Sequence, residues 1–208
     1  MSESPTPAVG VLDRPTPMVL SVARRLREAF SRGEVFTAAD EPRVIGLSSA
    51  TDAQKAFVTF TGTEVTVSAD SLAPAQVAWD VRWPDPVPAE ADPEALNGFA
   101  GEVRTLLTGL DVDWRSAAET FWERAKTLPG MPGGLSVYCF DEDAAAEFGD
   151  VANEGYGLLG TAAALARMFG GSSLLSEELG GGELALNGPL SGFSALVGAN
   201  LKVVCGEL

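Results

Sequence analysis

Apolar side chains recur at helical spacing near the start of the chain. Residues three and four positions apart share one face of a helix, and this spacing places five apolar residues together: Val19, Val22, Ala23, Leu26 and Phe30. Thr16 followed by Pro17 suits a helix cap with proline at the first helical position. Gly33 suits the end of the helix. The pattern therefore predicts a helix over residues 17–31.

Four short runs with the composition or the alternation of β-strands follow. These runs are residues 43–48, 55–61, 64–68 and 76–83. The last run is the clearest, because one face carries only apolar residues: Val77, Trp79, Val81 and Trp83. A fifth run, residues 135–141, is apolar on both faces and predicts a central strand.

Proline, glycine and cap residues divide the rest of the chain. The acidic, proline-rich stretch from Pro84 predicts a linker, and Asp92-Pro93 and Asp113 each suit the start of a helix. The acidic, alanine-rich residues 141–150 are interpreted as a helical turn, and a helix is expected from near Thr161.

The last thirty residues predict a compact unit with an apolar inner side. A short helix ends in the glycines 180–182, and a strand carries Leu184 and Leu186 on one face. Pro189 opens a further helix, and residues 201–205 are expected to form the last strand.

The chain has 14 Lys and Arg against 29 Asp and Glu, and this net charge of −15 restricts the classes of partner that it can bind. A field of that sign repels phosphate backbones, so we expect no nucleic-acid partner. No run of eighteen apolar residues exists, so no transmembrane segment is expected. The N-terminal residues have no signal-peptide pattern, and residues 1–15 are interpreted as a disordered, proline-rich leader.

The absence of histidine and the two cysteines restrict the chemistry further. Without histidine, Ser-His-Asp and Cys-His nucleophilic systems and the usual zinc sites are excluded. Cys139 and Cys205 lie in apolar runs and are interpreted as buried free thiols, which suits a cytoplasmic location. A disulfide remains the alternative. We therefore expect no catalytic residues, no metal and no cofactor.

Acidic and glycine-rich motifs were weighed as sites and rejected. The acidic residues of the stretch 141–150 lack the spacing of an EF-hand and are interpreted as a solvated face. The glycines 180–182 precede a strand, whereas a phosphate cradle needs them to open a helix. Carboxylate-only chemistry, at Asp80 or in the acidic cluster, is the only enzymatic alternative left.

Three C-terminal motifs carry a resemblance: TAAALARMFGG, SSLLSEELGGGELALNG and PLSGFSALVG. Together with the hairpin AFVTFTGTEVTVS, they resemble the sterol carrier protein 2 (SCP-2) family of lipid-binding domains. Residues 84–132 depart from the family pattern. The resemblance implies an α+β fold with an antiparallel five-stranded sheet covered by helices around an apolar tunnel. It also implies reversible binding of a lipid without covalent chemistry.

We therefore expect a single SCP-2-like domain over residues 16–208, in which residues from about 84 to 132 form a helical insertion. Alternatively, residues 84–132 are part of a second domain. The ligand would be a fatty acid, acyl-CoA, sterol-like lipid or other apolar small molecule, held non-enzymatically, with a mobile terminal helix controlling access. The candidate ligand-binding residues are Trp79, Trp83, Met168, Phe169, Leu175, Phe193 and Leu196. The alternative to a ligand site is ordinary core packing. The chain would then be a protein-interaction or accessory domain that uses the same fold with a filled core.

Overall fold

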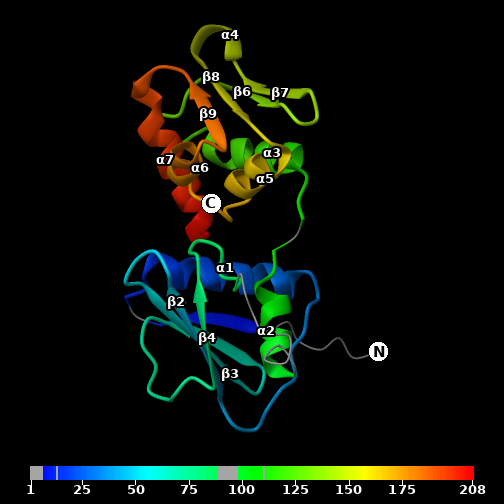
Figure 1. The fold of residues 1–208 in the computed structure, drawn as a ribbon, viewed down its shortest axis with the longest axis vertical. Helices are drawn as coiled ribbons and strands as arrows, with labels where there is room; N and C mark the ends of the chain where they lie inside the picture. Colours follow the sequence, from blue (N-terminus) through cyan, green and yellow to red (C-terminus); the bar gives the residue numbers. More distant parts are fainter. Residues whose placement is uncertain (1–6, 13, 89–97, 110) are drawn as a thin grey trace. The chain divides into compact units, whose positions relative to one another are not determined.

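The computed structural model describes residues 7–12, 14–88, 98–109 and 111–208. The chain is a mixed α+β protein that divides into two compact units, residues 1–110 and 111–208 (Figure 1). Each unit has its own sheet and its own helices. None of the helices in the described ranges is both long and apolar enough to span a membrane.

The first unit is built around a mixed five-stranded sheet in the order β1-β4-β3-β2-β5. Strands β2, β3 and β4 form an antiparallel meander, while β1 pairs parallel with β4 and β5 pairs parallel with β2. Its elements are β1 (Ala8–Val11), α1 (Pro17–Ser31), β2 (Arg43–Ser49), β3 (Lys55–Thr61), β4 (Glu64–Ser68), β5 (Val77–Val81) and α2 (Phe99–Leu107).

Helix α1 forms as its sequence predicts and supplies much of the core of this unit. The Thr16 hydroxyl accepts a hydrogen bond from the Val19 amide at 3.3 Å, so the predicted cap is confirmed. The apolar face of α1 is fully buried, and α1 packs on β3 and β4. Ser21 lies on the buried side of α1, where its hydroxyl accepts a hydrogen bond from the Trp83 indole at 3.0 Å.

The second unit is built around a mixed four-stranded sheet in the order β7-β6-β8-β9. The central strands β6 and β8 are parallel, and each edge strand pairs antiparallel with its neighbour. Its elements are α3 (Trp114–Ala125), β6 (Gly134–Cys139), β7 (Ala144–Gly149), α4 (Val151–Glu154), β8 (Gly155–Gly160), α5 (Ala162–Phe169), α6 (Leu175–Gly181), β9 (Leu184–Asn187) and α7 (Phe193–Cys205). Helices α3, α5, α6 and α7 share one apolar core with the inner face of this sheet (Figure 1).

The division into units differs from the expected single domain over 16–208 with an insertion at about 84–132. The boundary falls inside that stretch, because α2 completes the first unit and α3 begins the second. Asp92-Pro93 lies outside the described residues. The expected disordered leader over 1–15 is wrong where the structure describes it at residues 8–11, since these pair with β4 as strand β1.

Two local predictions in the second unit are wrong, and one strand was not predicted. Residues 144–149 form strand β7 instead of a helical turn, and residues 155–160 form strand β8, which the sequence pattern did not indicate. Residues 201–205 extend helix α7 instead of forming a strand. In α7 the buried residues follow helical spacing, and the β-branched pair Val203-Val204 is accommodated within it. The helix stops at Gly206, whose positive φ of 70° suits a glycine cap.

Candidate functional site

The strongest candidate site is a small void in the apolar core of the second unit. Eight apolar side chains surround it: Phe121, Leu135, Leu158, Met168, Phe169, Leu175, Leu186 and Leu196. They come from α3, β6, β8, α5, α6, β9 and α7, so nearly every element of the unit contributes. The volume open to the centre of a water molecule is about 10 Å³. This is room for roughly one water, and no polar side chain is there to bind it.

The lining follows from the local patterns of two helices and three strands. In α5, the Thr161 hydroxyl caps the helix by accepting from the Ala164 amide at 3.2 Å. Met168 and Phe169 lie three and four positions after Leu165, so all three are buried on one face. Strands β6, β8 and β9 alternate, and every second side chain points toward the helices: Leu135, Leu158 and Leu186 each occupy such a position.

A buried polar side chain, Asn200, fixes α7 above this core. It is 1% exposed. Its Oδ1 accepts a hydrogen bond from the Leu175 amide at 2.9 Å, and its Nδ2 donates to the carbonyls of Met168 and Ser173 at 2.8 and 3.2 Å. One side chain therefore joins α7 to the segment between α5 and α6. Asn200 was not among the residues predicted from the sequence, although a lone asparagine inside the apolar run of this helix is a usable signal of a buried hydrogen-bonding role.

The segment between β9 and α7 is held against Tyr156. The Tyr156 hydroxyl accepts a hydrogen bond from the Gly192 amide at 2.9 Å. A Cβ added at Gly188 or Gly192 would lie 2.7 or 2.9 Å from the ring, so both glycines allow close approach of the backbone. Between them, Leu190 is 86% exposed. Residues 188–191 are therefore exposed, while Gly192 is buried against Tyr156.

An ion pair joins α5 to α6 on the outside of the core. The Arg167 guanidinium donates through Nε and Nη2 to the two carboxylate oxygens of Glu178, both at 2.9 Å. Glu178 is only 6% exposed, and this bidentate pairing raises the pKa of Arg167. The pair holds the two helices that supply Met168, Phe169 and Leu175.

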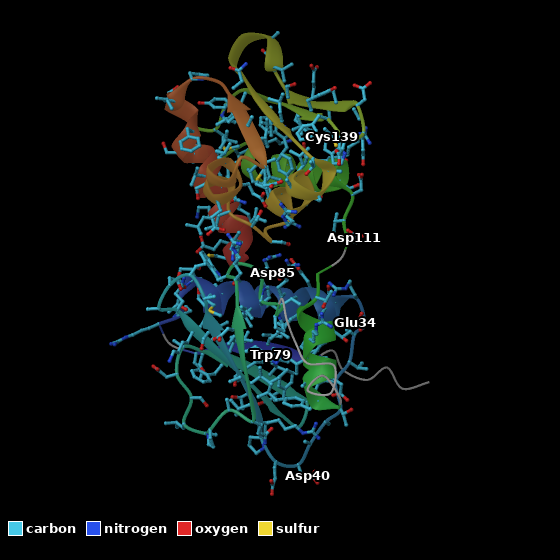
Figure 2. All side chains as sticks on the ribbon, viewed as in Figure 1. Glu34, Asp40, Trp79, Asp85, Asp111 and Cys139 are labelled. Carbon is cyan, nitrogen blue, oxygen red and sulfur yellow. The ribbon has the colours of Figure 1, made fainter. Side chains whose placement is uncertain are left out.

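Both cysteines are buried thiols that are not joined in a disulfide, as the sequence predicted. Cys139 lies at the end of β6 (Figure 2), and its thiol donates to Asp141 Oδ1 at 2.9 Å. Burial first, and then this hydrogen bond, raises the pKa of the Cys139 thiol. The same hydrogen bond, with a second from the Ala162 amide at 2.9 Å, lowers the pKa of Asp141. The thiol therefore stays protonated near neutral pH and is a poor nucleophile.

The acidic stretch after β6 is used for local structure. Besides Asp141, the Glu142 carboxylate accepts from the Trp114 indole at 2.9 Å, and Asp143 accepts from the Tyr138 hydroxyl at 2.8 Å. Within the described ranges, no three Cys, Asp or Glu side chains gather as a metal site would need.

The predicted ligand-binding residues are divided between the two units. Met168, Phe169, Leu175 and Leu196 line the void together. Phe193, one turn before Leu196, is partly exposed and is not part of the lining. The other two, Trp79 and Trp83, are buried in the first unit (Trp79 is labelled in Figure 2). The other four lining residues were not on the list of candidates: Phe121 on α3, and Leu135, Leu158 and Leu186, each on the inner face of a strand.

Fold and site together define a class of protein: a two-unit α+β protein whose second unit encloses a wholly apolar centre between a four-stranded sheet and helices. The comparisons with known proteins add no family to this description. No protein-family model, no curated protein and no solved structure matches the chain.

Proposed function

We propose that this protein is a non-enzymatic binding module that takes up an apolar ligand in the centre of its second unit. The observation that carries the proposal is the void, at which eight apolar side chains from helices and strands converge without a polar group among them. Ligand sites for acyl chains and sterol-like molecules are mostly apolar and lie between such elements. The proposed ligand is a fatty acid, an acyl-CoA or a sterol-like lipid, held by burial of its apolar part.

The proposed relationship to the SCP-2 family has support from the same place. The three motifs that carry the resemblance form α5, the pair α6 and β9, and α7. Each of these four elements contributes at least one side chain to the lining of the void. These three C-terminal motifs are therefore next to each other around one apolar centre, whereas the hairpin that shares the resemblance forms β3 and β4 of the first unit.

Uptake requires the core to expand, because a void of about 10 Å³ is far smaller than a lipid site of roughly 300 Å³ or more. We place the opening at residues 188–192, because the hydrogen bond from the Gly192 amide to the Tyr156 hydroxyl holds this segment against the second unit. The middle of α7 is fastened by Asn200 through three hydrogen bonds. Access by movement of this short segment therefore costs less than movement of the whole terminal helix.

The experiment that tests the proposal combines native mass spectrometry with uptake of a fluorescent palmitate analogue. The sharpest variant is Leu196→Ala, which removes about three carbons from the wall of the void and should strengthen uptake by enlarging it. Leu201→Ala is the matched control, because Leu201 lies on the same helix and is 40% exposed. A protein that purifies without lipid, and takes up no probe even as Leu196→Ala, contradicts the proposal.

The second candidate function is a protein-interaction or accessory domain with a filled core. The specific observation in its favour is the volume of the void, which in the described conformation admits roughly one water. The same uptake experiment separates the two candidates, since a filled core predicts no binding by the wild type. It also predicts that Leu196→Ala only lowers the free energy of unfolding.

A further inference from the structure

The outer face of the second sheet carries an apolar row that crosses all four strands. Tyr138 on β6 and Leu159 on β8 are 38% and 36% exposed. They are paired in register with each other, and then with Ala145 on β7 and Ala185 on β9, which are also exposed. We call these four residues the outer row. They point away from the helices, because the alternate residues of each strand form the core.

The surface beside the outer row is shallow on one side. The neighbouring row is Glu147, Ser136, Gly157 and Asn187, whose side chains are small or polar. Beyond it, the chain at the start of α4 covers the sheet, since the backbone at Val151 would lie 2.5 Å from a Cβ added at Gly134. The outer row therefore adjoins a part of the sheet that carries only small or polar side chains, and the chain at the start of α4 covers the sheet beyond that part.

The outer row lies over a parallel strand pair, and sheets built wholly of parallel strands are covered on both faces. In the first unit, the parallel pair β2 and β5 is covered in part on its outer face. Val44 is only 1% exposed, and Ala75 lies 3.3 Å from where a Cβ at Gly46 would be, whereas Ala78 and Asp80 on β5 are exposed. The described residues of the chain provide no similar cover over Tyr138 and Leu159.

The two charged side chains next to the outer row, in the β6–β7 turn and on β7, are acidic. Asp143 follows β6 and bonds the Tyr138 hydroxyl, and Glu147 lies in the next row on β7. Residues 111–208 contain five Lys and Arg against fourteen Asp and Glu, a side-chain net charge of −9. The cation beside this region, Arg115, lies 3.6 Å from the Glu142 carboxylate. Such a field attracts a basic partner and opposes face-to-face pairing with a second copy of the same chain.

We propose that the outer row is a docking surface for a basic amphipathic helix of a protein partner. A helix there would complete a three-layer arrangement, with helices on both faces of the sheet. The row spans three strand spacings, roughly 14 Å, which corresponds to about nine or ten helical residues. Ala145 and Ala185 leave room at its ends for larger apolar side chains of the partner, and lysines or arginines at the edge of that helix would meet Asp143 and Glu147.

This surface is separate from the proposed ligand site, because it lies on the opposite face of the sheet. It can bind a partner whether the apolar centre is loaded or filled. The test therefore uses a probe that reports on this face alone: a labelled helical peptide of leucine and lysine, roughly four turns long, with a leucine and glutamate peptide of the same pattern for comparison. Binding is measured by fluorescence anisotropy, and its location by backbone amide NMR shifts.

We expect the lysine peptide to bind and to shift the amides of the outer row and its neighbours. Leu159→Lys should weaken binding by about tenfold or more, since it places a cation among the peptide's cations. Leu201→Lys is the charge-matched control, because Leu201 on α7 is similarly exposed at 40%, and it should leave binding within about twofold. Tyr138→Ser gives a second, uncharged test, and circular dichroism checks that both variants fold.

Three results would overturn this proposal. The first is no binding, or equal binding of the lysine and glutamate peptides. The second is equal weakening by Leu159→Lys and Leu201→Lys, which would mean attraction by net charge alone. The third is sedimentation of the wild type as a dimer that Leu159→Lys dissociates, since the outer row would then be occupied by a second copy. Failure of lipid uptake would leave these outcomes unchanged, so the two proposals fail separately.

Discussion

Replacement of Asn200 by alanine should destabilise the second unit more than any surface substitution. Asn200 is 1% exposed and joins α7 to the segment between α5 and α6. Alanine removes the acceptor of the Leu175 amide and the donor to the carbonyls of Met168 and Ser173. The Met168 carbonyl still accepts from the Gly171 amide at 3.2 Å. Two backbone groups, at Leu175 and Ser173, thus lose the hydrogen bond that Asn200 gives them.

The expected loss follows from that count. A buried polar group without a partner costs about 1–3 kcal/mol, so two such groups correspond to about 2–6 kcal/mol in the free energy of unfolding. A unit of this length is stable by about 5–15 kcal/mol. The substitution should therefore remove a large part of its stability. Asn200→Leu keeps the volume but leaves the same groups unpaired, so it should cost a similar amount if hydrogen bonding, and not packing, is the cause.

Urea unfolding and amide hydrogen exchange measure the two parts of this prediction. Tryptophans occur in both units, so the loss is assigned to the second unit by exchange at the Leu175 amide, which should lose its protection in Asn200→Ala. Asn187→Ala is the control, because Asn187 is exposed on β9; it should change stability by less than about 0.5 kcal/mol. A cost below about 1 kcal/mol for Asn200→Ala, with Leu175 still protected, would refute the reasoning.

Three further outcomes are expected. Gly192→Ala should lower the free energy of unfolding by about 1–3 kcal/mol, because its Cβ would lie 2.9 Å from the Tyr156 ring. Gly180→Ala, in helix α6 with open space around its Cβ, should instead raise the free energy of unfolding by about 0.5–1 kcal/mol. Thermal unfolding of the two variants compares them, and equal effects would contradict the packing described. The pKa of Asp141 in the folded state is lowered from 3.8. The contribution of Asp141 to the free energy of unfolding is therefore present above pH 3.8 and is lost as the pH falls through the lower folded pKa. Asp141→Asn should make the loss of stability at acid pH less steep, and an unchanged pH dependence would contradict this. Cys139 should react with a thiol reagent at neutral pH only at the rate of unfolding, because burial raises its pKa; modification faster than unfolding would show that the thiol is accessible.

The first unit was largely predictable because its strands alternate clearly. The predicted runs 55–61 and 64–68 have the bounds of β3 and β4, and the helix predicted over 17–31 has those of α1. Residues 55–61 are rich in aromatic and β-branched side chains, Val65 and Val67 alternate with polar residues in 64–68, and a proline follows a good cap at the start of α1. Local pattern and tertiary packing favour the same structure there, so local reasoning was sufficient.

The strands of the second unit were less visible because small residues fill them. In β7 the residues 144–146 are all alanine, which favours a helix by intrinsic propensity, and β8 contains three glycines. Both become strands because each pairs along its length with β6. A pairing partner is a long-range property, and a window of a few residues does not contain it.

The candidate site was partly predictable for a related reason. Helical spacing placed Met168 and Phe169 on an inner face, and the structure shows that face at the void. The same kind of pattern placed Trp79 and Trp83 on an inner face, but of the other unit. Periodicity shows that a side chain is buried, whereas the core that it enters depends on where the chain divides, and that division was not apparent from the sequence.

The two units share one framework, and the difference in its filling explains why the second is the better candidate for binding. In each unit a helix precedes a hairpin, and a later strand pairs parallel with the first strand of that hairpin. In the first unit these are α1, the hairpin β2–β3 and strand β5. In the second unit they are α3, the hairpin β6–β7 and strand β8. In the first unit four aromatic rings contact one another in series, Phe30, Phe36, Phe60 and Phe99, with ring centroids 5.9, 4.9 and 5.3 Å apart, and they join α1 and α2 to the sheet. In the second, five leucines and Met168 line the void together with one ring pair, Phe121 and Phe169, whose centroids are 5.3 Å apart. Unbranched and flexible side chains such as methionine repack around a guest more readily than a series of contacting rings does. An apolar ligand would therefore enter the second unit in preference to the first.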